Sequence, residues 1–107
     1  MTELLLIRVN CPTQELAYRL AEATVDGRLA ACANIEGPIR TIYRWEGKLA
    51  RDEEYVLWLK ATEELWPDLE TLIIALHPAD TPAILAFPIA NAPEKFAKWV
   101  KGEVSVS

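Results

Sequence analysis

The sequence IRTIYRW at residues 39–45 is followed, after a polar segment, by YVLWLK at residues 55–60. Both stretches are rich in β-branched and aromatic residues, which favour pleated, half-buried strands. We therefore predict that they form a long hairpin. Its turn lies either at Glu46-Gly47-Lys48 or near Arg51-Asp52, because both segments are polar and typical of turns.

A strand and a helix are predicted before the hairpin. LLLIRV at residues 4–9 is a short apolar run, typical of a mostly buried strand. Thr13 is a suitable N-cap for the helix that follows, and Asp26-Gly27 ends it, with Gly27 suited to a left-handed C-terminal position. Residues 30–35 then begin the first hairpin strand, which Gly37-Pro38 bends or interrupts.

A helix, a strand and a short terminal helix are predicted after the hairpin. The first helix opens at Thr62 or Trp66 and ends at His77-Pro78. Residues 83–87 are apolar and lie between two prolines, which predicts a strand, and the terminal helix begins within residues 91–93. In the first helix a stripe of apolar residues faces a core: Leu65, Leu69, Leu72, Ile73 and Leu76. In the terminal helix Phe96, Trp99 and Val100 lie on one side.

The resulting order is strand–helix–strand–strand–helix–strand with an extra C-terminal helix. This order is typical of a ferredoxin-like α+β fold with an antiparallel sheet. Right-handed crossovers place both main helices on one face of the sheet, with the second and fourth strands at its edges. A long aromatic edge strand is open to pairing with another chain, and four tryptophans suggest more apolar surface than one small core absorbs. We therefore predict a homo-oligomer built through strand edges.

The composition limits the classes of function. The chain has 107 residues, 51% of them apolar, which is typical of a single domain spanning residues 1–107. Eleven Lys and Arg against 16 Asp and Glu give a net charge of −5, which argues against binding to nucleic acid or to anionic membranes. No apolar run is long enough to cross a bilayer and the start does not resemble a signal peptide, so we expect a cytoplasmic protein. No phosphate-loop, dinucleotide, metalloprotease or nucleophile-elbow motif occurs, so we do not expect an enzyme.

His77 is the single histidine and ends a predicted helix. One interpretation is a favourable interaction with the helix dipole. The other is a metal ligand or a proton-handling group, because imidazole is a common ligand of copper and zinc. One chain alone cannot complete such a site, whereas an oligomer brings copies of His77 and partner groups together.

Cys11 and Cys32 are too few for the disulfide framework of a small secreted protein, so both are expected to be free thiols. Cys11 precedes Pro12 near a predicted helix N-terminus, where the helix dipole lowers the pKa of a thiol. Cys11 is therefore either a reactive or copper-binding thiol or a small apolar filler at a strand end. Cys32 lies among alanines and is expected in the core. The carboxylates at residues 52–54 are expected to be solvated at a hairpin tip.

Four segments carry a family resemblance: LAACANI at residues 29–35, IYRWEGK at 42–48, LHP at 76–78 and FPI at 87–89. They resemble the CutA family, the divalent-cation tolerance proteins, and the resemblance runs from Leu5 to about Val100. It implies a ferredoxin-like subunit in a tight homotrimer, similar in architecture to PII signalling proteins. It also implies a cytoplasmic location and a link to tolerance of copper and other divalent cations.

The resemblance implies metal ligands as well. In the family, metal is associated with a histidine before the proline, here His77, and with a cysteine near the end of the first strand, to which Cys11 is close. The family often has two consecutive histidines, and Leu76 stands in the first position here. After the histidine the family usually reads HPYEVPEI, whereas residues 77–84 read HPADTPAI, without the aromatic ring and the carboxylate before the isoleucine. The departure implies a ligand that differs or is absent.

The leading hypothesis is a trimeric, non-enzymatic protein that binds a divalent metal such as Cu(II), with His77 and Cys11 as ligands and no obligatory cofactor. The alternatives are a PII-like regulatory module that senses a small ligand or docks an unidentified protein partner, and a trimerisation module without a metal function. A basic cleft around Arg40, Arg44 and Lys60 would favour an anionic ligand. The residues expected to line the cleft or the interface are Asn34, Tyr43, Trp45 and Lys60.

Overall fold

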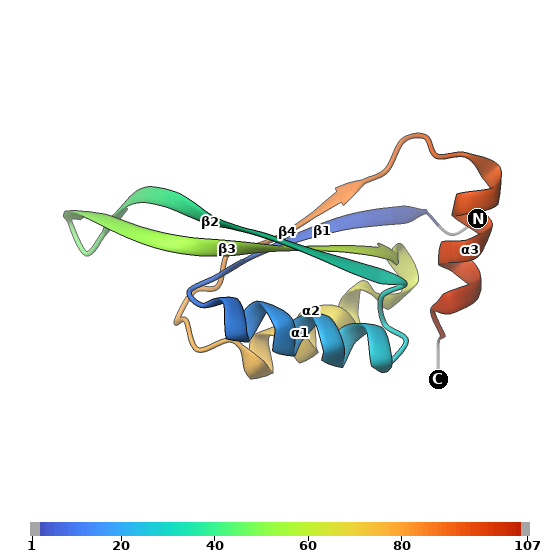
Figure 1. Ribbon diagram of the computed structural model, residues 1–107, viewed down its shortest axis with the longest axis horizontal. Coiled ribbons are helices and arrows are strands. Elements are labelled where there is room, and N and C mark those ends of the chain that lie inside the picture. The colour runs from blue at the N-terminus through green and yellow to red at the C-terminus, as the bar shows by residue number, and fades with distance from the viewer. Residues whose placement is uncertain (1–2, 106–107) are drawn as a thin grey trace.

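The computed structural model describes residues 3–105, and its elements follow the predicted order (Figure 1). The strands and helices are β1 (Leu4–Cys11), α1 (Gln14–Asp26), β2 (Cys32–Trp45), β3 (Lys48–Thr62), a 3-10 turn (Glu63–Leu65), α2 (Trp66–Leu76), β4 (Ile84–Pro88) and α3 (Glu94–Glu103).

The four strands form one antiparallel sheet in the order β2-β3-β1-β4, so β2 and β4 lie at the edges as predicted. Helices α1 and α2 cover the same face of the sheet, and α3 lies at the end of the sheet where β1 begins (Figure 1). This is the predicted ferredoxin-like α+β architecture with an additional C-terminal helix. No helix within residues 3–105 is long and apolar enough to cross a membrane.

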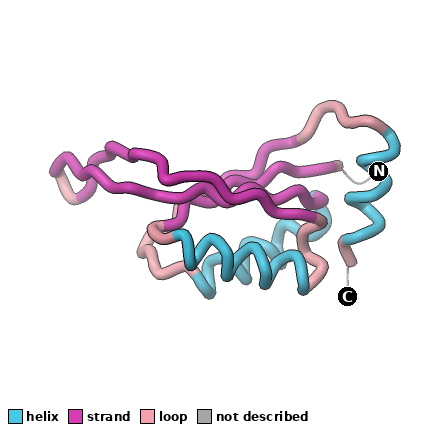
Figure 2. Tube along the Cα trace, viewed as in Figure 1, coloured by secondary structure: helices cyan, strands magenta, loops and turns pink. Residues whose placement is uncertain are grey.

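The hairpin of β2 and β3 is the longest feature of the fold, and it projects beyond the helices (Figure 2). Its turn lies at Glu46 and Gly47, which both have positive φ, so the alternative turn near Arg51 and Asp52 is wrong. Residues 51–54 belong to β3 despite their polarity, because they pair with residues 39–42 of β2. We call the part from the Ile39–Glu54 pair to the turn the arm.

The arm begins at an irregularity in β2. The register shifts between Glu36 and Ile39, so Gly37-Pro38 bends the strand without ending it. Gly37 has φ 138°, a backbone conformation that residues other than glycine rarely adopt. A Cβ there would lie 3.1 Å from the Glu54 carbonyl oxygen and 2.9 Å from a Tyr55 ring carbon. Glycine is therefore required where the arm leaves the body of the sheet.

Helix α1 starts as predicted and ends differently. The Thr13 hydroxyl accepts a hydrogen bond from the Leu16 amide at 3.1 Å, which caps the first turn. The left-handed residue at the other end is Arg28, with φ 61°, and the prediction that Gly27 takes this position is wrong, because Gly27 has φ −75°. Arg28 in turn donates hydrogen bonds to the carbonyl oxygens of Gly102 and Glu103, so it ties α3 to the end of α1.

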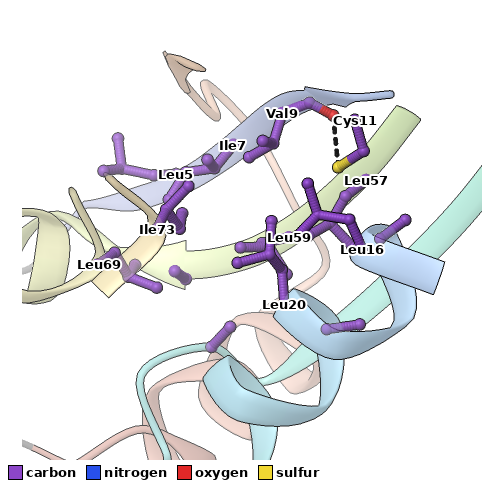
Figure 3. Close-up of a cluster of buried hydrophobic side chains, with 14 of the residues drawn as sticks. Leu5, Ile7, Val9, Cys11, Leu16, Leu20, Leu57, Leu59, Leu69 and Ile73 are labelled. Carbon is purple, nitrogen blue, oxygen red and sulfur yellow. Dashed lines mark hydrogen bonds between the residues drawn. The ribbon is translucent and has the colours of Figure 1, made fainter. Parts of the chain in front are cut away.

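The core lies between the sheet and the two helices (Figure 3). Alternate residues of β1 and β3 point into it, and they meet the buried sides of α1 and α2. Their removal from water is the main stabilisation of this two-layer fold. The largest fully buried side chains include Ile7, Val9, Leu20, Leu57, Leu59, Leu65, Leu69 and Ile73.

Candidate functional site

A groove of about 450 Å³ lies between the arm and the loop that joins α2 to β4. The arm contributes Thr41, Tyr43 and Trp45 from β2, with Asp52 and Glu54 from β3. The end of β1 and the residue after it form a further part of the wall. The lining residues from these other parts of the chain are Asn10, Pro12, His77, Ala79, Asp80, Thr81 and Ala83.

His77 is almost fully buried and both of its ring nitrogens are engaged. Nδ1 accepts a hydrogen bond from the Ala79 amide at 3.1 Å, so the ring proton resides on Nε2. Nε2 donates this proton to the Asn10 carbonyl oxygen at 2.8 Å. His77 therefore ties the end of β1 to the loop after α2, and a metal could bind it only after one of these hydrogen bonds is broken.

The carboxylates of the arm are held by polar neighbours. The Tyr43 hydroxyl donates a hydrogen bond to Asp52, and this bond is the main cause that raises the pKa of Tyr43 above its ordinary value. Asn10 donates to a Glu54 carboxylate oxygen at 3.3 Å. Asp80 stands opposite on the loop, where the Thr81 hydroxyl donates to it at 3.3 Å. Three carboxylates thus line the groove, those of Asp52, Glu54 and Asp80.

Cys11 faces the core and not the groove. Its side chain is fully buried, and the thiol is 3.9 Å from the Val9 carbonyl oxygen (Figure 3). Burial raises the pKa of Cys11 to about 11, with a smaller contribution from the charge of Glu54. The expectation that the pKa of Cys11 is lowered is therefore wrong, because burial disfavours the charged thiolate. Cys32 is free and half-buried, not fully enclosed in the core.

Asn34 and Lys60 lie away from the groove, on the sheet beyond the base of the arm. The Lys60 ammonium donates to the Asn34 side-chain oxygen across β2 and β3. Beside them the Trp58 indole donates to Glu36 at 2.6 Å, and the Arg8 guanidinium lies 5.5 Å from the Trp58 ring centroid. Of the four predicted cleft residues, the structure brings Tyr43 and Trp45 to the groove with His77 and leaves Asn34 and Lys60 on another surface.

A single chain does not provide a metal site within the part that the structure describes. No group of three His, Cys, Asp or Glu side chains in residues 3–105 converges closely enough to hold an ion. His77 uses both nitrogens and the Cys11 thiol is buried with a raised pKa. Metal binding prefers a deprotonated thiol and a free imidazole nitrogen, so these residues do not fit a metal in this arrangement.

The groove contains Asp52 and Glu54, whereas the sequence predicts residues 52–54 at a solvated hairpin tip. Asp52 and Glu54 are two positions apart on a strand, so their side chains lie on one face of the arm. Thr41, directly opposite Asp52, and Tyr43 share that face. The spacing of two positions between these residues is visible in the sequence. It predicts a shared face only when residues 51–54 are assigned to a strand. Asp80 carries no such signal, since a long-range contact brings its loop to the arm.

The fold and the groove define a small ferredoxin-like α+β protein with a projecting hairpin. A model of the CutA1 divalent ion tolerance protein family matches residues 5–103. The divalent-cation tolerance protein CutA of Thermus thermophilus is 41% identical over 101 residues, which are 94% of this chain and 96% of that protein. Protein CutA of Homo sapiens is 33% identical over 93 residues, 87% of this chain and 52% of that protein.

Solved structures agree with this relationship. CutA1 from Oryza sativa superimposes with a TM-score of 0.94 at 34% identity, covering 98% of this chain and 96% of that chain. CutA1 from Ehrlichia chaffeensis gives 0.92 at 36% identity, covering 99% of both chains. The chain belongs to the CutA1 divalent ion tolerance protein family, which is named for ion tolerance and not for a reaction.

Proposed function

We propose that the protein works as a cytoplasmic homotrimer that binds a divalent metal such as copper and contributes to metal homeostasis. The observation that supports the proposed homotrimer is the uncovered face of the sheet. Both main helices lie on the opposite face (Figure 1), so one side of this two-layer fold is left bare and is available to a partner.

The uncovered face is apolar along β4 and mixed along β3. Residues opposite each other on paired strands share a face, so Leu85 and Phe87 stand beside Arg8 and Leu6 of β1. Leu85 is 52% exposed and Phe87 42% exposed in the single chain. Contiguous exposed apolar side chains of this kind mark interfaces between proteins. A second and a third copy of the chain would bury them.

The metal has to be held by more than one copy in this proposal. His77 is the first proposed ligand and Cys11 the second. His77 has to give up a hydrogen bond, and Cys11 has to leave the core and lose its proton, before either binds the metal. Copper is favoured because it stands highest in the affinity order of divalent first-row metals. The family's name supports tolerance of divalent ions, and the free thiols Cys11 and Cys32 are consistent with the reducing cytoplasm.

Assembly is tested by light scattering on the eluted protein. We expect a mass about three times the 12.0 kDa of one chain at micromolar concentration. Phe87→Glu should shift the mass to that of one chain while the circular dichroism spectrum is kept, because a buried unpaired charge opposes association. Ile74→Glu is the matched control, since Ile74 is exposed on α2 and away from the bare face. A wild-type mass of one chain would contradict the trimer.

Metal binding is tested by calorimetry with Cu(II) near neutral pH. We expect wild-type protein to bind and His77→Asn to lose binding, while Asn keeps an acceptor for the Ala79 amide. Cys11→Ser should weaken binding, and acidification should weaken it further because protons compete with the metal for its ligands. Equal binding by wild type and both variants would remove His77 and Cys11 from the site. No binding by the wild-type trimer would refute the metal function.

A further inference from the structure

The groove between the arm and the loop after α2 carries charge of one sign. Asp52, Glu54 and Asp80 line it, and the described lining residues include no Lys or Arg. The basic cleft around Arg40, Arg44 and Lys60 that would favour an anion is therefore not this groove. The occupant that the charge favours is a cation.

The same walls are poorly suited to a bare metal ion. A divalent ion with oxygen ligands needs several that converge within about 2.0–2.6 Å. Here the carboxylates of Asp52 and Glu54 are held by Tyr43 and Asn10, and no three candidate ligands meet in the described part of the chain. A volume of about 450 Å³ is that of a small-molecule pocket.

Two aromatic rings complete the walls. Tyr43 is 38% exposed and Trp45 47% exposed, both from β2 and both on the groove. The face of an indole or phenol attracts an organic cation and packs against its alkyl stem. The Tyr43 hydroxyl bonded to Asp52 holds one ring next to a carboxylate. Aromatic faces beside carboxylates are a recognised arrangement for ammonium and guanidinium groups.

We propose that the groove binds an organic cation with a guanidinium or primary ammonium group. Glu54 and Asp80 from opposite walls receive the charged head, and Tyr43 and Trp45 cover the stem. The cation is supplied either by a free small amine or by a basic side chain of a protein. His77, a proposed copper ligand, also lines the groove, but recognition of the organic cation uses neither His77 nor Cys11.

The probes are ethylguanidinium and N-ethylurea, which have nearly the same shape and differ in charge. Binding to the assembled wild-type protein is followed by the shift of the Trp45 indole signal in proton–nitrogen spectra. We expect ethylguanidinium to move this signal saturably, with an affinity that falls as salt is added, and N-ethylurea to leave it unchanged. Agmatine and a short arginine-containing peptide amide are then compared, and tighter binding of one assigns the source of the cation.

The variants are Asp80→Asn and Glu54→Gln. Each should weaken ethylguanidinium binding by between about two- and fivefold, which is the range of an exposed ion pair, and the double variant by about tenfold. Asp68→Asn on the exposed side of α2 makes the same charge change away from the groove and should have no effect. Circular dichroism and light scattering check that fold and mass are kept.

Three results would overturn the proposal. The first is equal response to N-ethylurea and ethylguanidinium, which would remove the charge from recognition. The second is an unchanged affinity of the double variant for ethylguanidinium, which would show that the probe binds outside the groove. The third is displacement of ethylguanidinium by stoichiometric Cu(II), lost in the same carboxylate variants, which would make the groove a metal site. Assembly is measured by light scattering and copper binding by calorimetry. A negative result in either experiment does not change how the three results above are interpreted.

Discussion

The Cys11 thiol has no exposed surface, and burial raises its pKa to about 11 from the ordinary 9.0. A raised folded-state pKa means that the neutral thiol is the stabilised form. Its contribution to stability is complete below the unfolded pKa and is lost as pH rises through about 11. At neutral pH Cys11 is a core side chain.

Thiol labelling tests this directly. In a Cys32→Ala chain at about pH 8, Cys11 should react with an aromatic disulfide about a hundredfold more slowly than in the urea-unfolded chain, because less thiolate is present. The matched Cys11→Ala chain reports Cys32 alone. Native labelling of Cys11 at the unfolded rate would show that the thiol is accessible and active.

His77 shows what a sequence can and cannot say about a single residue. Its position at the end of α2 was predictable from the apolar stripe before it and the proline after it. The hydrogen bond to the Asn10 carbonyl was not, because it joins residues 67 positions apart. The same holds for Asp80, which reaches the groove only through the packing of its loop against the arm. The type of a residue therefore predicts which interactions its side chain can make. Contacts with distant parts of the chain decide which of them it makes.

At the scale of elements, the long hairpin was predicted from its aromatic and β-branched residues, while the position of its turn was left between two polar segments. Residues 51–54 are polar and were compatible with a turn, but both sides of the arm face solvent, so polarity is no obstacle to strand formation there. Glu46 and Gly47 take the turn because they adopt positive φ.

Gly37 at the base of the arm gives a measurable consequence. Gly37→Ala should lower the free energy of unfolding by about 1–3 kcal/mol, because it forces a side chain into a rarely populated backbone region. A Cβ would also lie 3.1 Å from the Glu54 carbonyl oxygen. Urea unfolding at fixed protein concentration measures the change.

Gly102→Ala is the control for this substitution. Gly102 lies in α3 with open space where a Cβ would stand, so alanine there should be neutral or raise stability by up to about 1 kcal/mol. Equal effects of the two substitutions would mean that the base of the arm tolerates a side chain.

At the scale of the whole molecule, the sheet divides the chain into a covered and an uncovered side. The molecule measures 45 × 26 × 21 Å, and the arm accounts for much of the longest dimension (Figure 2). The covered side was predictable, since handed crossovers place both helices together. In the proposed trimer, the orientation of the copy that covers the bare side depends on contacts between chains, which no periodicity within one chain encodes.

The bend at Gly37-Pro38 has a consequence for newly synthesised chains. In the single chain, β2 is a long free edge that could recruit another unfolded strand and start aggregation. Pro38 offers no amide hydrogen, and the register shift beside it breaks the row of donors and acceptors. Arg40 and Arg44 add repelling charge further along the edge. We therefore expect the irregularity at the base of the arm to limit indiscriminate pairing along this edge as well.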